Sequence, residues 1–382
     1  MAGLYLHIPF CRQRCTYCDF YFVTTQRSHA GFIAATKREI EHYAHHYAAR
    51  EPISTIYFGG GTPSQLLPEE WFELLDALYL AFDTSTLQEV TAEVNPGDVD
   101  LDYLRELRHL GINRLSIGIQ SFFEDDLKAL NRSHSAHEAE EILALAGTAG
   151  FENYSIDLIF GIPEQPFEYW GANLEKADRF GVPHISTYGL TIEEGTPLEK
   201  EVRRGLVNPA SDESMSDLYR FTMDYLRGRG YEHYEISSFA RPGMRSQHNE
   251  SYWNHSNYLG FGPSAHSFWW KGLPAHRWSN LRNLPRYEAI LMQGHLPLED
   301  RETLSLDRLT NEYIMLRLRT SDGIDLAELS QRYGADLLHE KATVVQQSIR
   351  EGLLSETAGR LILTDEGKLV CNALTEKLLL DE

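Results

Sequence analysis

Residues 7–18 read HIPFCRQRCTYC and contain three cysteines, Cys11, Cys15 and Cys18. The chain has 382 residues and one other cysteine, Cys371, far from this segment. Iron-sulfur clusters normally take four thiolates. Three thiolates at such close spacing therefore indicate a 4Fe-4S cluster in which one iron has no protein ligand and is open to a small molecule.

Two alternatives to a cluster stay open at this point. Zinc usually takes four protein ligands, and His7 would be the fourth, but the chain lacks a second C-x2-C pair. The three thiols could also be small buried apolar side chains, although this spacing is more typical of a metal site. Cys371 lies on an apolar helical face and is predicted to be such a buried side chain.

The composition is that of an acidic globular protein. Its hydrophobic content of 42% supports a large core and two or three domains. The net charge of -21 disfavours nucleic acid and anionic membranes as partners. We find no transmembrane segment and no secretory signal, and three cysteines in a cluster leave no disulfide pair. We therefore expect a cytoplasmic protein.

Short apolar runs alternate with helical stretches along the first half of the chain. These runs cover residues 4–8, 53–58, 89–94, 114–119, 154–160 and 184–190. Right-handed crossovers would wind them into a parallel sheet, and six units are fewer than the eight of a closed barrel. The sequence therefore predicts an α/β fold with a partial (β/α)6 barrel in residues 1–240, and ligands at the carboxyl ends of its strands.

Two motifs in the first 20 residues, YLHIPFC at 5–11 and YCDF at 17–20, resemble the radical S-adenosylmethionine superfamily. Within it, the resemblance is to relatives of the oxygen-independent coproporphyrinogen III oxidase, and it covers most of residues 3–300. It implies that the amino and carboxylate groups of S-adenosylmethionine chelate the open iron. It also implies that one electron from the cluster splits this cofactor to a 5'-deoxyadenosyl radical.

The resemblance assigns cofactor contacts to the start and to the second strand end of the barrel. Tyr5 and Tyr17 would lie near the adenosine and the cluster. Gly60, Gly61 and Thr62 would form the loop that receives the methionine amino group through backbone acceptors. Taken alone, three glycines before a proline equally indicate a tight turn.

Polar residues at later strand ends receive roles from the same resemblance. Glu93 and Gln120 would contact the ammonium and the hydroxyls of the cofactor, Arg132 would bind its carboxylate, and Asp157 would be another cofactor contact. These residue types suit a ligand that carries an ammonium, a sulfonium, a carboxylate and a diol. Solvated or capping roles are the alternative for each of these residues taken singly.

Region 241–300 is rich in aromatic residues, glycine and histidine, and it contains four of the six tryptophans. Such a segment suits a flat apolar ligand with an axial nitrogen donor, as haem requires, or an aromatic lid over the barrel. The string HNESYW at 248–253 resembles the signature of the HemW-type haem chaperones. This resemblance favours haem and makes His248 the predicted ligand, with His255 and His266 as alternatives. We treat the region as a connecting segment.

Residues 301–382 resemble a winged-helix module. Asp325 and Glu328 have capping-box spacing before a short helix, Gly352 would end a second helix, and residues 353–363 would form a two-stranded wing. From Asp325 onward, eleven acidic residues against six basic ones oppose contact with phosphates. We therefore predict a cap or docking domain rather than a DNA-binding one.

Two functions share this cluster and cofactor, a coproporphyrinogen III oxidase and a haem chaperone that passes haem to an acceptor protein. Three departures from the oxidases favour the chaperone: Asp19-Phe20 follows Cys18 where the oxidases resemble Cys-Gly-Cys, the chain begins directly with the first strand, and the 248–253 motif is present. A radical enzyme for an unrelated substrate is the third possibility.

The expected partners are haem, a haem-acceptor protein and an electron donor such as a flavodoxin or ferredoxin. We expect the chain to be a monomer or a homodimer.

Overall fold

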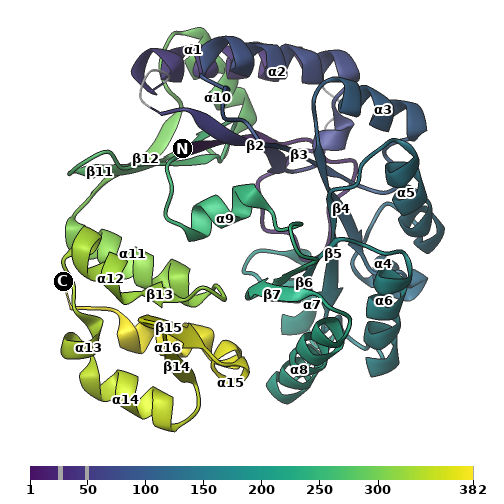
Figure 1. The fold of residues 1–382 in the computed structure, drawn as a ribbon. Coiled ribbons are helices and arrows are strands. Elements are labelled where there is room, and N and C mark those ends of the chain that lie inside the picture. The colour runs from purple at the N-terminus through teal and green to yellow at the C-terminus, as the bar shows by residue number, and fades with distance from the viewer. Residues whose placement is uncertain (25–28, 48–50, 382) are drawn as a thin grey trace.

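The computed structural model describes residues 1–24, 29–47 and 51–381, and its largest element is a twelve-stranded sheet (Figure 1). Its six parallel central strands follow sequence order: β1 (Ala2–Ile8), β2 (Ile53–Gly60), β3 (Glu89–Val94), β4 (Arg114–Gln120), β5 (Tyr154–Phe160) and β6 (His184–Gly189). Strand β1 pairs with β2 on one side and with β9 (Tyr258–Phe261) on the other, rather than with β6. The sheet is therefore open, and the predicted α/β fold with a partial barrel is confirmed.

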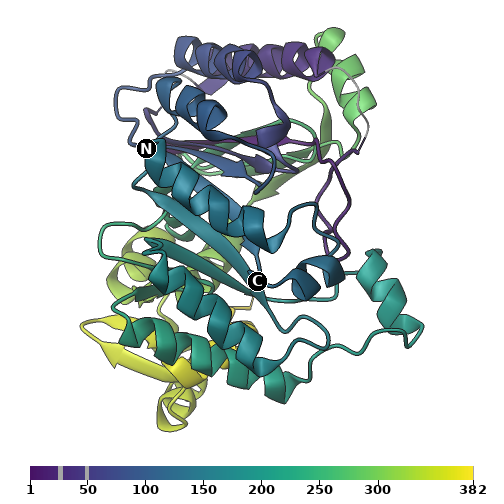
Figure 2. The same ribbon diagram turned by 90° about the vertical axis from the view of Figure 1, so that its right-hand side faces the viewer.

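Helices follow the parallel strands and cover the outer face of the sheet, as the two views in Figures 1 and 2 show. They are α1 (Ala30–Tyr47), α2 (Pro68–Ala81), α3 (Leu101–His109), α5 (Ala136–Thr148), α6 (Phe167–Arg179) and α8 (Asp212–Gly228). The chain also forms three short elements after strand ends: the 3-10 turn η1 (Pro63–Gln65), α4 (Glu124–Ala129) and α7 (Pro197–Arg203), of which α7 projects from the sheet in Figure 2. Local sequence explains their starts: Pro68 is the first residue of α2, and Ser135 with Glu138 forms a capping box at α5.

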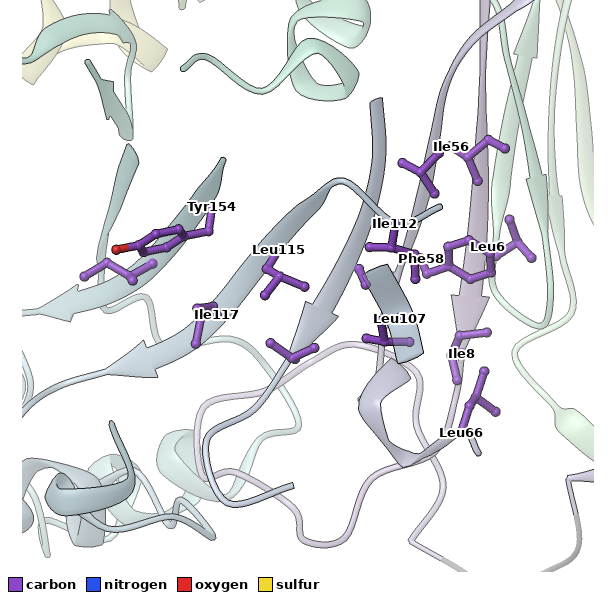
Figure 3. Packing of buried hydrophobic residues seen from close by; sticks show 14 of the residues in the cluster. Leu6, Ile8, Ile56, Phe58, Leu66, Leu107, Ile112, Leu115, Ile117 and Tyr154 are labelled. Atoms are coloured by element: carbon purple, nitrogen blue, oxygen red, sulfur yellow. The ribbon is translucent and has the colours of Figure 1, made fainter. Parts of the chain in front are cut away.

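Apolar side chains between the sheet and these helices fix the positions of the strands. Figure 3 shows Leu6 and Ile8 of β1 near Ile56 and Phe58 of β2, and all four are fully buried. Nearly continuous apolar runs are typical of parallel strands covered by helices, and burying each such side chain contributes about 1.5–3 kcal/mol. The carboxyl ends of the strands, where polar residues gather, therefore rest on a rigid frame.

The sheet continues beyond the parallel strands at both edges. The further elements are β7 (Glu232–Glu235), β8 (Ser238–Ala240), α9 (Gln247–Trp253), β9, β10 (His266–Trp269), β11 (Ala275–Asn280), α10 (Leu284–Met292) and β12 (Leu298–Leu304). The sequence of residues 231–239 predicts one further strand, and this prediction is wrong because the chain turns between β7 and β8 and pairs them antiparallel. The Ser237 amide donates to the Glu235 carboxylate at 3.1 Å within this turn.

The C-terminal domain has its own three-stranded sheet and its own core. Its elements are α11 (Leu306–Leu318), β13 (Ile324–Asp325), α12 (Leu326–Glu328), the π-helical turn η2 (Leu329–Tyr333), α13 (Leu337–Glu340), α14 (Ala342–Arg350), β14 (Leu354–Thr357), β15 (Arg360–Leu363), α15 (Asp365–Leu369) and α16 (Cys371–Leu378). Asp325 caps α12 and β14 pairs with β15, as the wing prediction requires. Phe268 and Ala275 of the large sheet join this core and connect the two parts.

Candidate functional site

The loop after β1 is fixed by backbone hydrogen bonds at its base and in its middle. The Cys11 amide donates to the carbonyl of Val23 at 3.0 Å, which closes the base. In the middle, the Thr16 amide donates to Leu130 at 3.1 Å, and the Leu198 amide donates to the Thr16 carbonyl at 2.9 Å. The loop is therefore held between the ends of α4 and α7, at the carboxyl end of β1.

All three cysteines of this loop line one pocket of about 520 Å³, which we call the thiol pocket. The Thr62 hydroxyl donates to Cys11 Sγ at 3.3 Å, and Arg132 Nη1 donates to Cys15 Sγ at 3.5 Å. Burial raises the pKa of Cys11 to about 12 and that of Cys18 to about 11. The thiols are thus partly shielded from water and receive hydrogen bonds at sulfur.

This donor set fits an iron-sulfur cluster. Hydrogen bonds to sulfur and limited solvent exposure are the features by which proteins set cluster potentials. In the described part of the chain, no three His, Cys, Asp or Glu side chains are grouped so that they could hold a single metal ion. The zinc alternative with His7 is also unsupported because both ring nitrogens of His7 have other partners, the Tyr5 hydroxyl at 3.2 Å and the Tyr21 carbonyl at 2.8 Å.

The glycines after β2 bring the backbone close to the cysteine loop. Gly60 has a φ of +104°, a conformation that favours glycine, and a Cβ atom there would overlap the His7 ring. A Cβ on Gly61 would lie 2.7 Å from the carbonyl oxygen of Ile8. Glycine is therefore sterically required at both positions, and with Thr62 these residues line the thiol pocket beside the cysteines.

Two half-buried carboxyl groups, Glu93 and Asp157, line the same pocket. Glu93 accepts from the Tyr57 hydroxyl at 2.8 Å and from the Gly60 amide at 3.2 Å. Burial raises the pKa of Glu93 to about 7, and burial also raises the pKa of Asp157 to about 6 although the Arg114 charge opposes it. Carboxyl groups at this depth become stable as anions when a cation binds to them.

Arg132 is one of two arginines that line the pocket, and the other, Arg12, is paired with Asp98. Nη2 of Arg132 donates to Asn95 Oδ1 at 2.6 Å and to the Gly118 carbonyl at 3.0 Å, while the buried Nε of Arg132 has no hydrogen-bond partner among the described residues. A carboxylate ligand would satisfy that donor. Gln120, at the end of β4, has a φ of +63°, and this strained backbone turns its side chain into the pocket wall.

The two predicted tyrosines lie in different places. Tyr17 lines the thiol pocket, and burial raises its pKa. Tyr5 lines a neighbouring cavity instead. Sequence reasoning missed Tyr188, which lines the thiol pocket from the end of β6. The sequence does carry a signal for it, because Tyr188 lies near the carboxyl end of the sixth predicted strand, 184–190, where ligand groups are expected.

The neighbouring cavity, which we call the histidine cavity, has a volume of about 590 Å³. It lies between β1, strands β9–β11 and helix α11, and three histidines are among its lining residues: His7, His255 and His266. Gly60 and Glu93 line both the histidine cavity and the thiol pocket, as do Asp19 and Phe20. The two spaces therefore adjoin, and a ligand in one would lie beside a ligand in the other.

His248 lies outside the residues that line these two spaces. Its ring is 1% exposed, Nδ1 lies 2.8 Å from the Thr55 hydroxyl, and Nε2 lies 2.8 Å from the Tyr252 hydroxyl. It also stacks on Tyr57 with ring centroids 5.0 Å apart. This geometry gives the histidine a packing role that joins α9 to β2, and it offers no support for the prediction that His248 binds iron.

Comparisons with known proteins agree with this fold. The radical SAM superfamily model matches residues 5–177, and the HemN C-terminal domain model matches residues 304–370. The structure of coproporphyrinogen III oxidase (HemN) from Escherichia coli superimposes with a TM-score of 0.83 at 23% identity and covers 99% of this chain and 90% of that one.

Curated relatives are similar over nearly the whole length. The heme chaperone HemW of Lactococcus lactis is 33% identical, over 99% of this chain and 97% of the relative. The heme chaperone HemW of Escherichia coli is 34% identical, over 99% of this chain and 98% of the relative. The chain therefore belongs to the HemW family of the radical S-adenosylmethionine superfamily.

Proposed function

We propose that this protein is a haem chaperone that carries a 4Fe-4S cluster and S-adenosylmethionine and passes haem to an acceptor protein. The observation that carries the proposal is the full-length similarity to curated relatives named heme chaperone HemW. The histidine cavity next to the thiol pocket supports it, because the cavity volume of about 590 Å³ lies within the usual range for small-molecule sites, roughly 300–1,000 Å³.

The residues of the thiol pocket support the cofactor part of the proposal. Cys11, Cys15 and Cys18 would hold the cluster, Glu93 would accept from the ammonium of S-adenosylmethionine, and Arg132 would bind its carboxylate. When bound, a reduced cluster supplies single electrons to the neighbouring cofactor. The side chains of this chain orient both groups and limit their contact with water.

Coproporphyrinogen III oxidase activity is the second candidate, and the likeness to the HemN structure favours it. At 23% identity, however, this likeness shows a shared fold and no more. Asp19 and Phe20, which stand where the oxidases resemble Gly-Cys, line both the thiol pocket and the histidine cavity. This sequence difference from the oxidases therefore lies at the boundary between the two spaces, where it would contact ligands in both.

Incubation of the reduced, reconstituted protein with S-adenosylmethionine tests both candidates. Haem is added in one reaction and coproporphyrinogen III in the other, and products are separated by liquid chromatography. We expect about one haem bound per chain and unchanged coproporphyrinogen III. Formation of protoporphyrinogen would overturn the chaperone assignment in favour of the oxidase.

In the described part of the chain, no helix is long and apolar enough to cross a membrane. The cytoplasmic location, the acceptor protein, the electron donor and the oligomeric state stay predictions.

A further inference from the structure

The histidine cavity contains one imidazole that is available to a ligand. His7 is engaged at both ring nitrogens, as described above. His255 is 4% exposed, with Nδ1 3.0 Å from the Tyr333 hydroxyl and Nε2 3.2 Å from the Glu312 carboxylate. His266, the first residue of β10, is exposed, and its ring has no hydrogen-bond partner among the residues that the structure describes. Of these three lining histidines, His266 is thus the one free to coordinate iron.

Two arginines, Arg277 and Arg282, line the cavity together with His266. Desolvation, and after it the positive charges of these arginines, lower the pKa of His266 although the Asp300 charge opposes them, which favours the neutral imidazole that binds a metal. Arg277 is paired with Glu302 and Glu312. Arg282 is exposed and donates to the carbonyl of Asp19 at 2.9 Å, and no described carboxylate forms an ion pair with it.

The other lining groups suit a flat apolar ring. Phe20 is 65% exposed, although large aromatic side chains are usually buried, and it lines both the cavity and the thiol pocket. Tyr258 and Phe268 line the cavity from β9 and β10. Of the lining carboxylates, Glu312 forms an ion pair with Arg277 and lies 3.2 Å from His255 Nε2. The cavity therefore offers an aromatic wall, a neutral imidazole and an unpaired guanidinium.

We propose that haem binds in the histidine cavity with His266 as its axial ligand and with a propionate paired to Arg282. The proposal rests on the proposed chaperone function and adds the place and the ligand of the cargo. It also excludes the motif histidine His248 as the ligand, because both nitrogens of that buried ring are already bonded. Haem in this cavity would lie directly beside the cofactor in the thiol pocket.

The test is a titration of haemin into the anaerobically reconstituted full-length protein, followed by Soret difference spectra and electron paramagnetic resonance. In His266→Ala, we expect loss of the ligand-induced Soret shift and a rise in Kd of about tenfold or more, since an axial bond is lost. Added imidazole should restore the spectrum. Arg282→Ala should raise Kd about two- to fivefold, as for an exposed ion pair.

His276→Ala is the matched control, because His276 lies on the adjacent strand β11 and points to the face opposite its cavity-lining neighbour Arg277. It should bind haem as the wild type does. His266→Met keeps a side chain of similar bulk and should change the ligand-field spectrum even if the alanine variant folds poorly. Intact cluster absorption shows that each variant is folded.

The two proposals fail in different ways. If the wild-type protein does not bind haem, the chaperone function is overturned. If the wild-type protein binds haem and both His266 variants give the wild-type spectrum and the wild-type Kd, the chaperone function stands and the assignment of His266 is overturned.

Discussion

The thiol pocket and the histidine cavity adjoin, yet they are assembled in opposite ways. The thiol pocket takes its cysteines from a single loop and its other polar groups from the ends of successive parallel strands. The histidine cavity combines β1 with strands β9–β11 and helix α11, which lie more than 200 residues further along the chain. The thiol pocket is thus encoded locally, whereas the histidine cavity depends on long-range packing.

The largest expected effect is loss of the iron-sulfur cluster from the thiol pocket without loss of haem binding in the histidine cavity. Cys15→Ala should remove one of three thiolates, so that iron falls from about four per chain to less than one and the visible absorption of the cluster disappears. Haem binding should persist, because His266 and Arg282 belong to strand β10 and the segment after β11. Iron analysis and the haemin titration measure the two properties on one sample.

Thr16→Ala is the control for this substitution, since Thr16 is the next residue in the loop and its hydroxyl donates to the Ala129 carbonyl at 3.2 Å. It should retain about four irons. Loss of haem binding together with the cluster in Cys15→Ala would show that the two spaces form one site. Retention of iron would contradict the assignment of Cys15 as a ligand.

The thiol pocket should respond to pH through Glu93. Because burial raises its pKa to about 7, the carboxyl holds a proton below that pH and cannot pair with the ammonium of S-adenosylmethionine. We expect the affinity to weaken as pH falls from 8 to 6, approaching about tenfold per pH unit below 7. Anaerobic equilibrium dialysis at several pH values measures it, and Glu93→Gln should bind more weakly with a flatter profile.

Glu39→Gln provides the matched control for this pH dependence. Burial also raises the pKa of Glu39 to about 7, but this carboxylate is held by Tyr287, Asn280 and the Gly262 amide between α1 and α10. The variant should keep the wild-type pH profile for S-adenosylmethionine. A wild-type affinity that does not change with pH would contradict the ammonium contact at Glu93.

The parallel strands follow local rules, and the same rules bring the predicted cluster and cofactor residues, apart from Tyr5, together in the thiol pocket. Apolar runs mark the strands, and ligand groups follow strand ends, so the sequence alone predicts that Glu93, Gln120 and Asp157 lie together. Tyr188 was missed although the same rule applied to β6. The split of 231–239 into two strands was missed because short antiparallel turns depend on individual contacts, such as that of Ser237 with Glu235.

The histidine cavity was less predictable for a physical reason. The motif at 248–253 drew attention to His248, but sequence does not reveal that Thr55 and Tyr252 occupy its ring nitrogens. His255 and His266 are similar in the sequence, and they differ in that Glu312 and Tyr333, both in the C-terminal domain, engage the first and not the second. Contacts between distant segments decide which histidine stays free.

The smallest expected effect concerns the cysteine outside the loop. Cys371 is 7% exposed in the C-terminal core, so Cys371→Ala should lower the free energy of unfolding by about 1 kcal/mol and leave about four irons bound. Leu374→Ala, one helical turn away, should cost about 2–5 kcal/mol in urea unfolding, also without loss of iron. If Cys371→Ala alone lost the cluster absorption, Cys371 would be its fourth thiolate, no iron would be open, and S-adenosylmethionine would have no metal position to occupy in the thiol pocket.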